Sequence, residues 1–470
     1  MRCPESKRGR CLCWSGVVLC VIGLIVWISL ASKRKCTDGS FPKAAVAADS
    51  ETCSKVGRDM LQRGGSAVDG AIAALLCTSV VNPQSMGLGG GAIFTVMDCS
   101  GNVTIISSRE TVPKSFKSDL LQKCDTKSGP DWIGEGVKVS PVLGEYIKYI
   151  NENISLSLYQ LFSDSNGEPL KAGDIVKFEK LADTLEVIAK NGPNAFYSGK
   201  IAEDLISDIQ QAGGTMTLQD LASFRATQSA PWVFNFEEFK AYIPPPPAGG
   251  AILALVLNIM KGFKLDPKSM KPEEKTMAYH RYIEAFKFAN GLKKHIKDPM
   301  ASSDKTAEKF IQDSFADHIR SLITNRTHEP QHYNPSSYQD SMGTTHMSVL
   351  AEDGSAVSVT STINMIFGSN VFSEKTGIIL NNELADFCER VEEIHAGERP
   401  PSNAAPTVFK SKSKTLVIGA SGGGFITTGI ASTLMNHLWF GKSLQEAVDT
   451  PVVYVNSVNH RSLKCHLIRE

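Results

Sequence analysis

The alternation of small, β-branched and polar residues is most regular over residues 343–364, GTTHMSVLAEDGSAVSVTSTIN. Two such runs flank Asp353-Gly354, a pair that favours a hairpin turn because glycine accepts positive φ. The pattern therefore predicts a β-hairpin. Its many Ser and Thr hydroxyls are unusual for strands built only for packing, but they are ordinary in a sheet with one solvated face. Taken alone, this stretch favours the solvated face.

Hydrophobic periodicity predicts further elements around the hairpin. Helical spacing predicts helices at residues 54–62, 66–76, 181–190, 201–212, 251–260, 279–292 and 426–439. Short apolar runs predict strands at residues 44–48, 92–97, 103–108, 377–380 and 415–418. Residues 301–340 are polar, contain prolines and indicate an exposed connector that ends just before Gly343. Such a position suits a self-cleaving junction.

One long apolar run, residues 15–31, is at the short end of what spans a bilayer. Basic residues lie on both sides of it. A cleaved signal peptide is the alternative, because Ser29-Leu30-Ala31 resembles a cleavage site. The basic stop Lys33-Arg34-Lys35 favours an uncleaved signal-anchor. We therefore expect a cytoplasmic tail at residues 1–14, a transmembrane helix, and an extracellular remainder in a single-pass type II plasma-membrane protein.

Composition changes this picture little. The chain has 470 residues, 42% of them hydrophobic, which is enough for a substantial core. Its net charge of zero gives no indication of a nucleic-acid partner. Glycosylation sequons at Asn102, Asn153 and Asn325 agree with export.

Cys53 and Cys77 flank a predicted helical segment and are a candidate disulfide. No cysteines have metal-ligand spacing, so we predict no metal site.

Three further segments carry candidate chemistry. Arg109 ends a predicted strand and is a possible carboxylate clamp, although a surface ion pair is the commoner explanation. Glu383 and Asp386 would share one face of a helical turn and could hold a cationic amine, unless the turn is simply solvated. Residues 419–424, GASGGG, join a strand to a helix and would aim backbone N–H groups at negative charge. That arrangement suits either nucleotide binding or an oxyanion hole.

Several longer segments, taken together, resemble the gamma-glutamyltransferases, which are N-terminal-nucleophile hydrolases. They run in family order from about residue 42 to about residue 456: AAVAADSETCSKVGRDMLQRGGSAVDGAIAALLC, NPQSMGLGGG, SRETVP, PPPPAGGAI, the hairpin, GIILNNE and IGASGGG. Some of them are most similar to the leukotriene-C4-hydrolysing branch. The resemblance implies an α/β (α+β) fold, a four-layer αββα sandwich made as a precursor.

The resemblance also implies a chemistry. The Gly343–Thr344 bond would break itself, leaving a large chain, 36–343, and a small chain, 344–470, that form a heterodimer. Thr344 Oγ would be the nucleophile, and the freed amine of the same residue would be its base. Thr362 would orient Thr344 by hydrogen bonding. No cofactor or metal is implied.

The implied substrate is a γ-glutamyl amide such as glutathione, a glutathione conjugate or leukotriene C4. Arg109, helped by Ser402, would bind its α-carboxylate, and Asn403 stands where the family usually has a second serine. Glu383 and Asp386 would bind its α-ammonium. Water, an amino acid or a dipeptide would accept the glutamyl group. The residues leave open which substrate is preferred and whether hydrolysis or transfer predominates.

The resemblance implies three further roles: contact with the α-ammonium, stabilisation of the oxyanion and a disulfide bond. Asn364 would lie beside the α-ammonium, and the Gly422 and Gly423 N–H groups would hold the tetrahedral oxyanion. Cys53–Cys77 matches a family disulfide.

Compared with the family, the chain is short between Leu161 and Ser163 and stops soon after Asn456. An inactive, truncated membrane glycoprotein of the same family is therefore the alternative expectation. A cephalosporin acylase is a weaker one, because Arg109 with Glu383 and Asp386 suits a zwitterionic amino-acid end.

Overall fold

The computed structural model describes residues 43–116, 137–151, 155–265, 271–334, 343–388 and 393–455. The expected tail and anchor, residues 1–31, lie outside these ranges, as does Asn153. Within the described ranges, no helix has the length and apolar character needed to cross a membrane.

The predicted hairpin lies inside a six-stranded antiparallel sheet. In spatial order, the strands are β1 (Ala45–Ala48), β9 (Gly343–Leu350), β10 (Ala356–Asn364), β2 (Gly91–Met97), β3 (Val103–Ser107) and β6 (Thr227–Ser229). The hairpin strands β9 and β10 therefore have a neighbour on each side. The turn between them is longer than Asp353-Gly354 alone predicts: Leu350 and Ala356 form the closing pair, and five residues connect them.

A second antiparallel sheet packs against the first. It consists of β14 (Thr415–Ile418), β13 (Thr407–Lys410), β8 (Phe239–Ile243) and β7 (Trp232–Phe236). Between the sheets, the Ser358 hydroxyl donates to the carbonyl of Ile418 at 2.9 Å, and the Thr95 hydroxyl donates to the carbonyl of Pro406 at 2.7 Å. The face that the hydroxyl pattern suggested to be solvated is thus an interior face.

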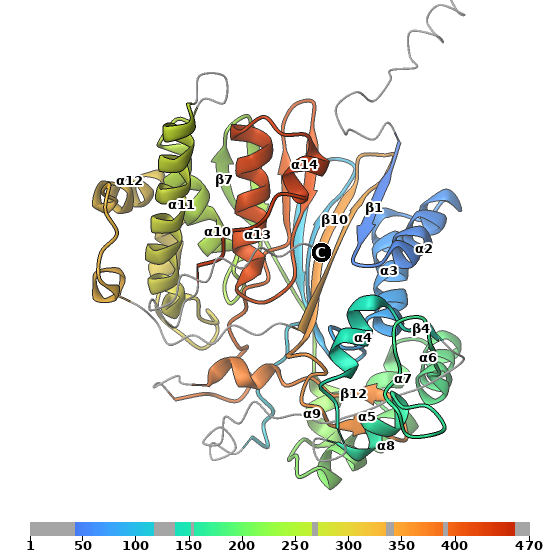
Figure 1. The fold of residues 1–470 in the computed structure, drawn as a ribbon. Helices are drawn as coiled ribbons and strands as arrows, with labels where there is room; N and C mark the ends of the chain where they lie inside the picture. The colour runs from blue at the N-terminus through green and yellow to red at the C-terminus, as the bar shows by residue number, and fades with distance from the viewer. Residues whose placement is uncertain are drawn as a thin grey trace, which may run out of the picture. The chain divides into compact units, whose positions relative to one another are not determined.

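Helices cover the outer faces of both sheets, which gives a mixed α/β architecture (Figure 1). On one side, α2 (Glu51–Gln62) and α3 (Ala67–Val81) contact β1 and β9. On the other, α10 (Gly250–Lys261), α11 (Pro272–Leu292) and α13 (Phe425–Leu434) form the largest apolar core with β7 and β8. The shorter helices on this side are α12 (Asp313–Leu322), α14 (Leu444–Val448), η2 (Lys293–His295), η3 (Thr306–Lys309), η4 (Pro330–Tyr333) and the π-helical turn η6 (Met435–Trp439).

A third group of short helices has its own apolar core, which includes Ile363 near the end of β10 (Figure 1). Its helices are α4 (Pro141–Ile147), α5 (Leu156–Leu161), α6 (Glu179–Asn191), α7 (Asn194–Tyr197), α8 (Lys200–Gln211) and α9 (Leu218–Ser223). Two small strand pairs belong to it, β4 (Val137–Lys138) with β5 (Ile175–Val176) and β11 (Phe372–Ser373) with β12 (Ile378–Ile379). The 3₁₀ helix η5 (Glu383–Phe387) follows β12.

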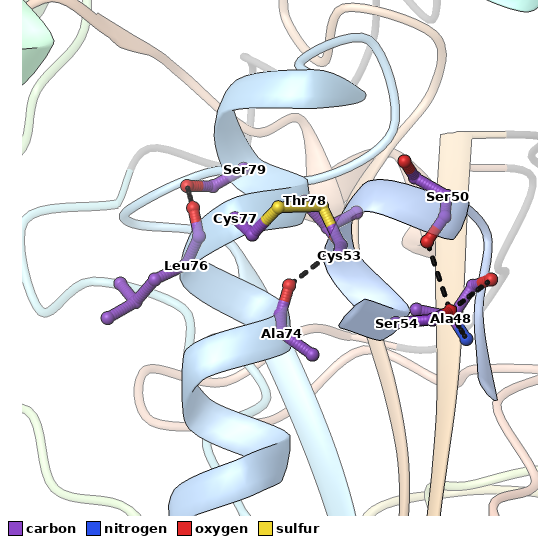
Figure 2. Close-up of a disulfide and its surroundings, with 9 residues drawn as sticks. All are labelled: Ala48, Ser50, Cys53, Ser54, Ala74, Leu76, Cys77, Thr78 and Ser79. Carbon is purple, nitrogen blue, oxygen red and sulfur yellow. Dashed lines mark hydrogen bonds between the residues drawn. A yellow bond between two sulfur atoms is a disulfide. The ribbon is translucent and has the colours of Figure 1, made fainter. Parts of the chain in front are cut away.

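The helix pair α2–α3 shows how sequence sets close packing here. A capping box begins α3, with Asp69 N–H donating to the Ser66 hydroxyl and Ser66 N–H to the Asp69 carboxylate. At the crossing point, a Cβ on Gly57 would lie 2.9 Å from the carbonyl oxygen of Gly70, so only glycine fits. The disulfide Cys53–Cys77 joins the two helices across this contact, with a Cα–Cα distance of 5.3 Å (Figure 2).

The expected exposed connector at residues 301–340 is wrong over much of its described part. The structure has α12 there, as well as η3 and η4, and Phe310, Ile319 and Tyr333 are buried in the largest core. Few apolar residues are present, but they lie at helical spacing and supply one buried stripe.

Candidate active site

Thr344 lies opposite Thr362 at the end of the hairpin where β9 begins. Both side chains are 7% exposed. The Thr344 hydroxyl donates to the Thr362 oxygen at 3.3 Å, and the Thr362 hydroxyl donates to the carbonyl oxygen of Gly343 at 2.5 Å. The backbone N–H of Asn364 donates to the same Thr362 oxygen at 2.7 Å. Thr362 therefore joins the hydroxyl of residue 344 to the carbonyl that precedes it.

Gly343 is held where no larger residue fits. A Cβ at this position would lie 2.2 Å from the carbonyl oxygen of Met365. Gly343 pairs with Asn364, where the register of the two strands shifts, and Asn364 has a positive φ of 76°. The strand that faces the Gly343–Thr344 bond is thus irregular at Asn364, and backbone of this kind is common at functional sites.

His346 is a neighbour of Thr344 that the sequence analysis missed. It lies two residues along β9, on the same face as Thr344, so the two-residue period of a strand could have found it. Its ring hydrogen-bonds with the hydroxyls of Thr360 and Ser348, both at 3.0 Å. Burial lowers the pKa of His346 to about 3, so the ring is neutral at physiological pH.

Arg109, Glu383 and Asp386 form a buried ion-pair cluster. Arg109 is 2% exposed and Glu383 is fully buried. The two ends of the Arg109 guanidinium pair with Glu383 and Asp386, respectively. Its Nε also donates to the carbonyl of Pro400 at 3.2 Å, and its Nη2 to that of Pro401 at 2.8 Å. The carboxylates predicted to hold an amine thus hold a guanidinium here.

Two acceptors in this cluster have no hydrogen-bond partner among the described residues. They are Oε1 of Glu383 and Oδ1 of Asn364, and both atoms are buried. Asn364 Nδ2 donates to the carbonyl of Asn382 at 3.0 Å, which places Asn364 beside η5. Because unmade hydrogen bonds of buried atoms are costly, a ligand with N–H donors is the natural partner for both.

Ser402 and Asn403 belong to the loop that holds Arg109, since Pro400 and Pro401 precede them. Ser402 N–H donates to the carbonyl of Pro247 at 2.8 Å, and its hydroxyl accepts from Ala404 N–H. The proline run at residues 244–247 therefore contacts and positions this loop.

The glycine loop lies between β14 and α13, as predicted. Gly422 and Gly423 have positive φ values of 90° and 58°, which favour glycine. At the start of the loop, a Cβ on Gly419 would lie 2.1 Å from the His346 ring. This contact holds the start of the loop against the strand that carries Thr344.

A cavity of about 1430 Å³ lies beside the ion-pair cluster and is lined by Glu110, Asn382 and Glu383 together with many apolar side chains. Neither Thr344 nor Gly422 lines it. Glu110 is a second residue that sequence reasoning missed. The one feature of the sequence that could have identified Glu110 is its position next to Arg109.

The structure describes two of the three predicted glycosylation sites. Asn102 and Asn325 are exposed, as glycosylation requires. Within the described ranges, no group of three or more His, Cys, Asp or Glu side chains is arranged to hold a metal ion.

The stacked sheets and the threonine hairpin define a mixed α/β fold of the N-terminal-nucleophile hydrolase type. A family model described as gamma-glutamyltranspeptidase matches residues 53–134 and 130–463. The chain belongs to this gamma-glutamyltranspeptidase family.

Among similar proteins, the glutathione hydrolase 5 proenzyme of Rattus norvegicus is 39% identical over 505 residues, covering 96% of this chain and 88% of the rat protein. The human proenzyme of that name is 38% identical, with 90% and 84% covered. The alignment with the rat protein is longer than this 470-residue chain. The rat protein therefore has segments that this chain lacks.

Two solved structures share the fold. Cephalosporin acylase from Bacillus halodurans superposes with a TM-score of 0.73 at 22% identity, over 89% of this chain and 86% of the acylase. Helicobacter pylori gamma-glutamyltranspeptidase superposes with a TM-score of 0.55 at 21% identity, over 62% of this chain and 95% of the bacterial one.

Proposed function

We propose that this chain is a self-processing extracellular γ-glutamyl hydrolase and transpeptidase. The observation that carries the proposal is the adjacency of two groups: a buried Thr344 hydroxyl bonded to Thr362, and the Arg109–Glu383–Asp386 cluster with its unsatisfied acceptors. Asn364 belongs to both groups, because its backbone N–H contacts Thr362 and its side chain contacts Asn382. Membership of the gamma-glutamyltranspeptidase family supports the same activity.

Self-cleavage follows from the hydrogen bonds of Thr362. As Thr344 Oγ attacks the Gly343 carbonyl carbon, its proton passes to Thr362, and the Thr362 proton passes to the Gly343 carbonyl oxygen. When the C–N bond breaks, that proton moves to the Thr344 nitrogen and an ester remains. Water then hydrolyses the ester, which releases the Gly343 carboxylate and restores the Thr344 hydroxyl. The Thr344 amine, freed when the C–N bond broke, serves the next reaction as a base.

Substrate binding would be an exchange of ion pairs. The α-carboxylate of a γ-glutamyl group would form an ion pair with the Arg109 guanidinium, whose planar fork matches a carboxylate. The α-ammonium of the substrate would form ion pairs with Glu383 and Asp386. It would also donate N–H groups to Asn364 Oδ1 and Glu383 Oε1. The site then keeps its charges paired after a zwitterion enters. Ser402 would add a hydroxyl near the carboxylate, with Asn403 beside it.

The chemical step would place the γ-carbonyl carbon at Thr344 Oγ. The N–H groups of Gly422 and Gly423 would hold the oxyanion, and each such donor is typically worth about 3 kcal/mol of barrier. The amine leaves with a proton taken from Thr344, and a γ-glutamyl ester remains. Water, an amino acid or a dipeptide then takes the glutamyl group, and no cofactor enters any step.

Several finer features belong to the same proposal. The stacked layers would be the αββα sandwich, cut into chains 36–343 and 344–470 that form a heterodimer. Residues 15–31 would anchor it in the plasma membrane as a type II protein with residues 1–14 in the cytoplasm. Asn102, Asn153 and Asn325 would carry glycans. Glutathione would be a substrate, as the name of the glutathione hydrolase 5 relatives suggests. Its conjugates, including leukotriene C4, would be further substrates.

The test uses the full-length wild-type chain, exported and membrane-bound, with three p-nitroanilides. One carries the γ-glutamyl group, the second lacks its α-amino group, and the third lacks its α-carboxylate. An unpaired buried charge costs about 3–5 kcal/mol, so each analogue should lose at least about 100-fold in kcat/KM. Equal turnover of all three would contradict the assignment, and a chain that turns over none of them would be the inactive relative.

A further inference from the structure

Glu110 is a buried carboxyl group that the proposed mechanism does not use. It follows Arg109 directly, and its carboxyl lies against the backbone of Gly91, where a Cβ would be 2.3 Å from Oε2. Gly91 is opposite Thr362, and Thr362 is opposite Thr344. Residues that face each other across an antiparallel sheet point to the same side. The Glu110 carboxyl therefore extends the row of Thr344 and Thr362 on the same face of the sheet.

This carboxyl lacks a hydrogen-bond partner among the described residues. The side chain as a whole is 14% exposed, but both of its oxygens are buried and neither has a hydrogen bond to another described residue. Arg109 Nη1 lies 3.8 Å from Oε2, which is too far for a hydrogen bond. Glu110 also lines the cavity beside Glu383. A buried polar group without a partner, at the wall of a binding site, indicates a partner supplied by a ligand.

The charged groups around Glu110 explain its protonation state. Burial raises the pKa of Glu110 to about 8. The positive charge of Arg109 and the backbone N–H of Glu110 itself oppose that rise, and the negative charge of Asp386 adds to it. Glu383 and Asp386 already give the cluster two carboxylates for one guanidinium, so a charge on Glu110 would be a third negative charge. At neutral pH, Glu110 is therefore uncharged and carries one O–H donor.

We propose that Glu110 binds the α-carboxylate of the substrate by donating its carboxyl O–H, next to the Arg109 fork. The inference rests on the proposed function, which places that carboxylate at Arg109. A carboxylate on the Nη1 side of Arg109 enters the space next to Oε2, where an acid–carboxylate hydrogen bond is short and strong. An ionised Glu110 would instead repel the substrate. Glu110 is thus a specificity residue that works only while it holds its proton.

The test compares KM against pH for the wild type, Glu110→Gln and Glu110→Leu, with one γ-glutamyl substrate. Wild-type KM should be constant near pH 7 and rise about tenfold per pH unit above about pH 8. Glu110→Gln keeps an N–H donor and cannot ionise, so its KM should stay within threefold of wild type at pH 7 and lack that rise. Glu110→Leu should raise KM about tenfold at pH 7, with kcat within threefold.

Titration of the substrate amine is common to all three enzymes and cancels in the comparison. Glu186→Gln, an exposed glutamate paired with Lys190, is the matched control and should keep the wild-type profile. Glu110→Leu removes a buried unpaired carboxyl, so its thermal midpoint should not fall below that of the wild type. That measurement identifies a variant that fails to fold.

A wild-type KM that stays flat to pH 9 would overturn the inference, whether or not the variants fold. The same alkaline rise in Glu110→Gln, or a wild-type KM in Glu110→Leu at pH 7, would also overturn it. These outcomes differ from a failure of the proposed function, in which the wild-type chain would turn over no γ-glutamyl substrate at all.

Discussion

Thr362 shows how one hydroxyl can serve two partners. It accepts from the Thr344 hydroxyl and donates to the Gly343 carbonyl, so it contacts both the attacking group and the group attacked. A strand residue with this pair of contacts is more than an orienting neighbour. In the uncut chain, the nitrogen of Thr344 is an amide and cannot act as a base, so the proposed self-cleavage would move the proton through the Thr362 hydroxyl.

Thr362→Ala should therefore slow self-cleavage about 100- to 1,000-fold, the usual effect of losing one donor to a developing oxyanion. Pulse labelling of the full-length chain, followed by the appearance of the small fragment, measures the rate. Thr362→Ser keeps the hydroxyl and is the matched control, with a rate near that of the wild type. Cleavage of Thr362→Ala at the wild-type rate would exclude the proton path.

His346 gives a prediction about stability and pH. Its pKa is about 3 in the folded chain, against an ordinary value of 6.5, because burial disfavours the charged ring. As pH falls below 6.5, the unfolded chain binds a proton that the folded chain does not. The free energy of unfolding therefore falls by about 1.4 kcal/mol per pH unit from this group. Above pH 6.5, His346 contributes no pH dependence.

Chemical denaturation of Thr344→Ala, which should remain one chain, can measure this. Between pH 6.5 and pH 5, the stability of that chain should fall by about 2 kcal/mol more than the stability of the same chain with His346→Gln. Equal falls in both chains would show that His346 is protonated in the folded state.

At the scale of elements, the hairpin was predictable because its signal is local: alternating residues and Asp353-Gly354. The glycine loop was predictable for the same reason. The pairing of Arg109 with Glu383 was not, because 274 residues separate them and no local pattern encodes the contact. Residues 301–334 were mistaken for a connector because their few apolar residues are outnumbered, although α12 buries Ala316 and Ile319 on one face.

The α2–α3 pair supports β1 and β9, and its disulfide should contribute measurably to stability. The two cysteines are 24 residues apart, and a closed loop of that size stabilises the folded state by about 3 kcal/mol. Replacing both Cys53 and Cys77 by alanine in the Thr344→Ala chain should lower the free energy of unfolding by that amount. Reducing the parent chain is the control and should give at least the same loss, because Cys388 is also disulfide-bonded. A loss below 1 kcal/mol would contradict the prediction.

At the scale of the whole molecule, the candidate site draws on both proposed chains. Arg109 and Glu110 would belong to the large chain, and Thr344, Glu383 and Asp386 to the small one. The largest core likewise mixes residues from before and after position 344, such as Leu255 with Ile430. Two chains cut at Gly343 would therefore stay together through shared packing.

The presence of strands on both sides of the hairpin also bears on the inactive alternative. β1 and β2 flank β9 and β10, so the sheet around Thr344 is complete among the described residues. The segments that the rat relative has in addition are not needed for this part of the sheet. The shortened chain thus retains the frame that the proposed reaction requires.

The identity of the residue at the new N-terminus tests the central claim most directly. The full-length wild-type chain, purified from membranes, should give two polypeptides, and sequencing of the smaller one should read Thr344-Thr345-His346-Met347. Thr344→Ala should give one uncut chain, and Thr344→Ser should still be cut. A wild-type chain that stays whole, or a Thr344→Ala chain that is cut after Gly343, would contradict the account.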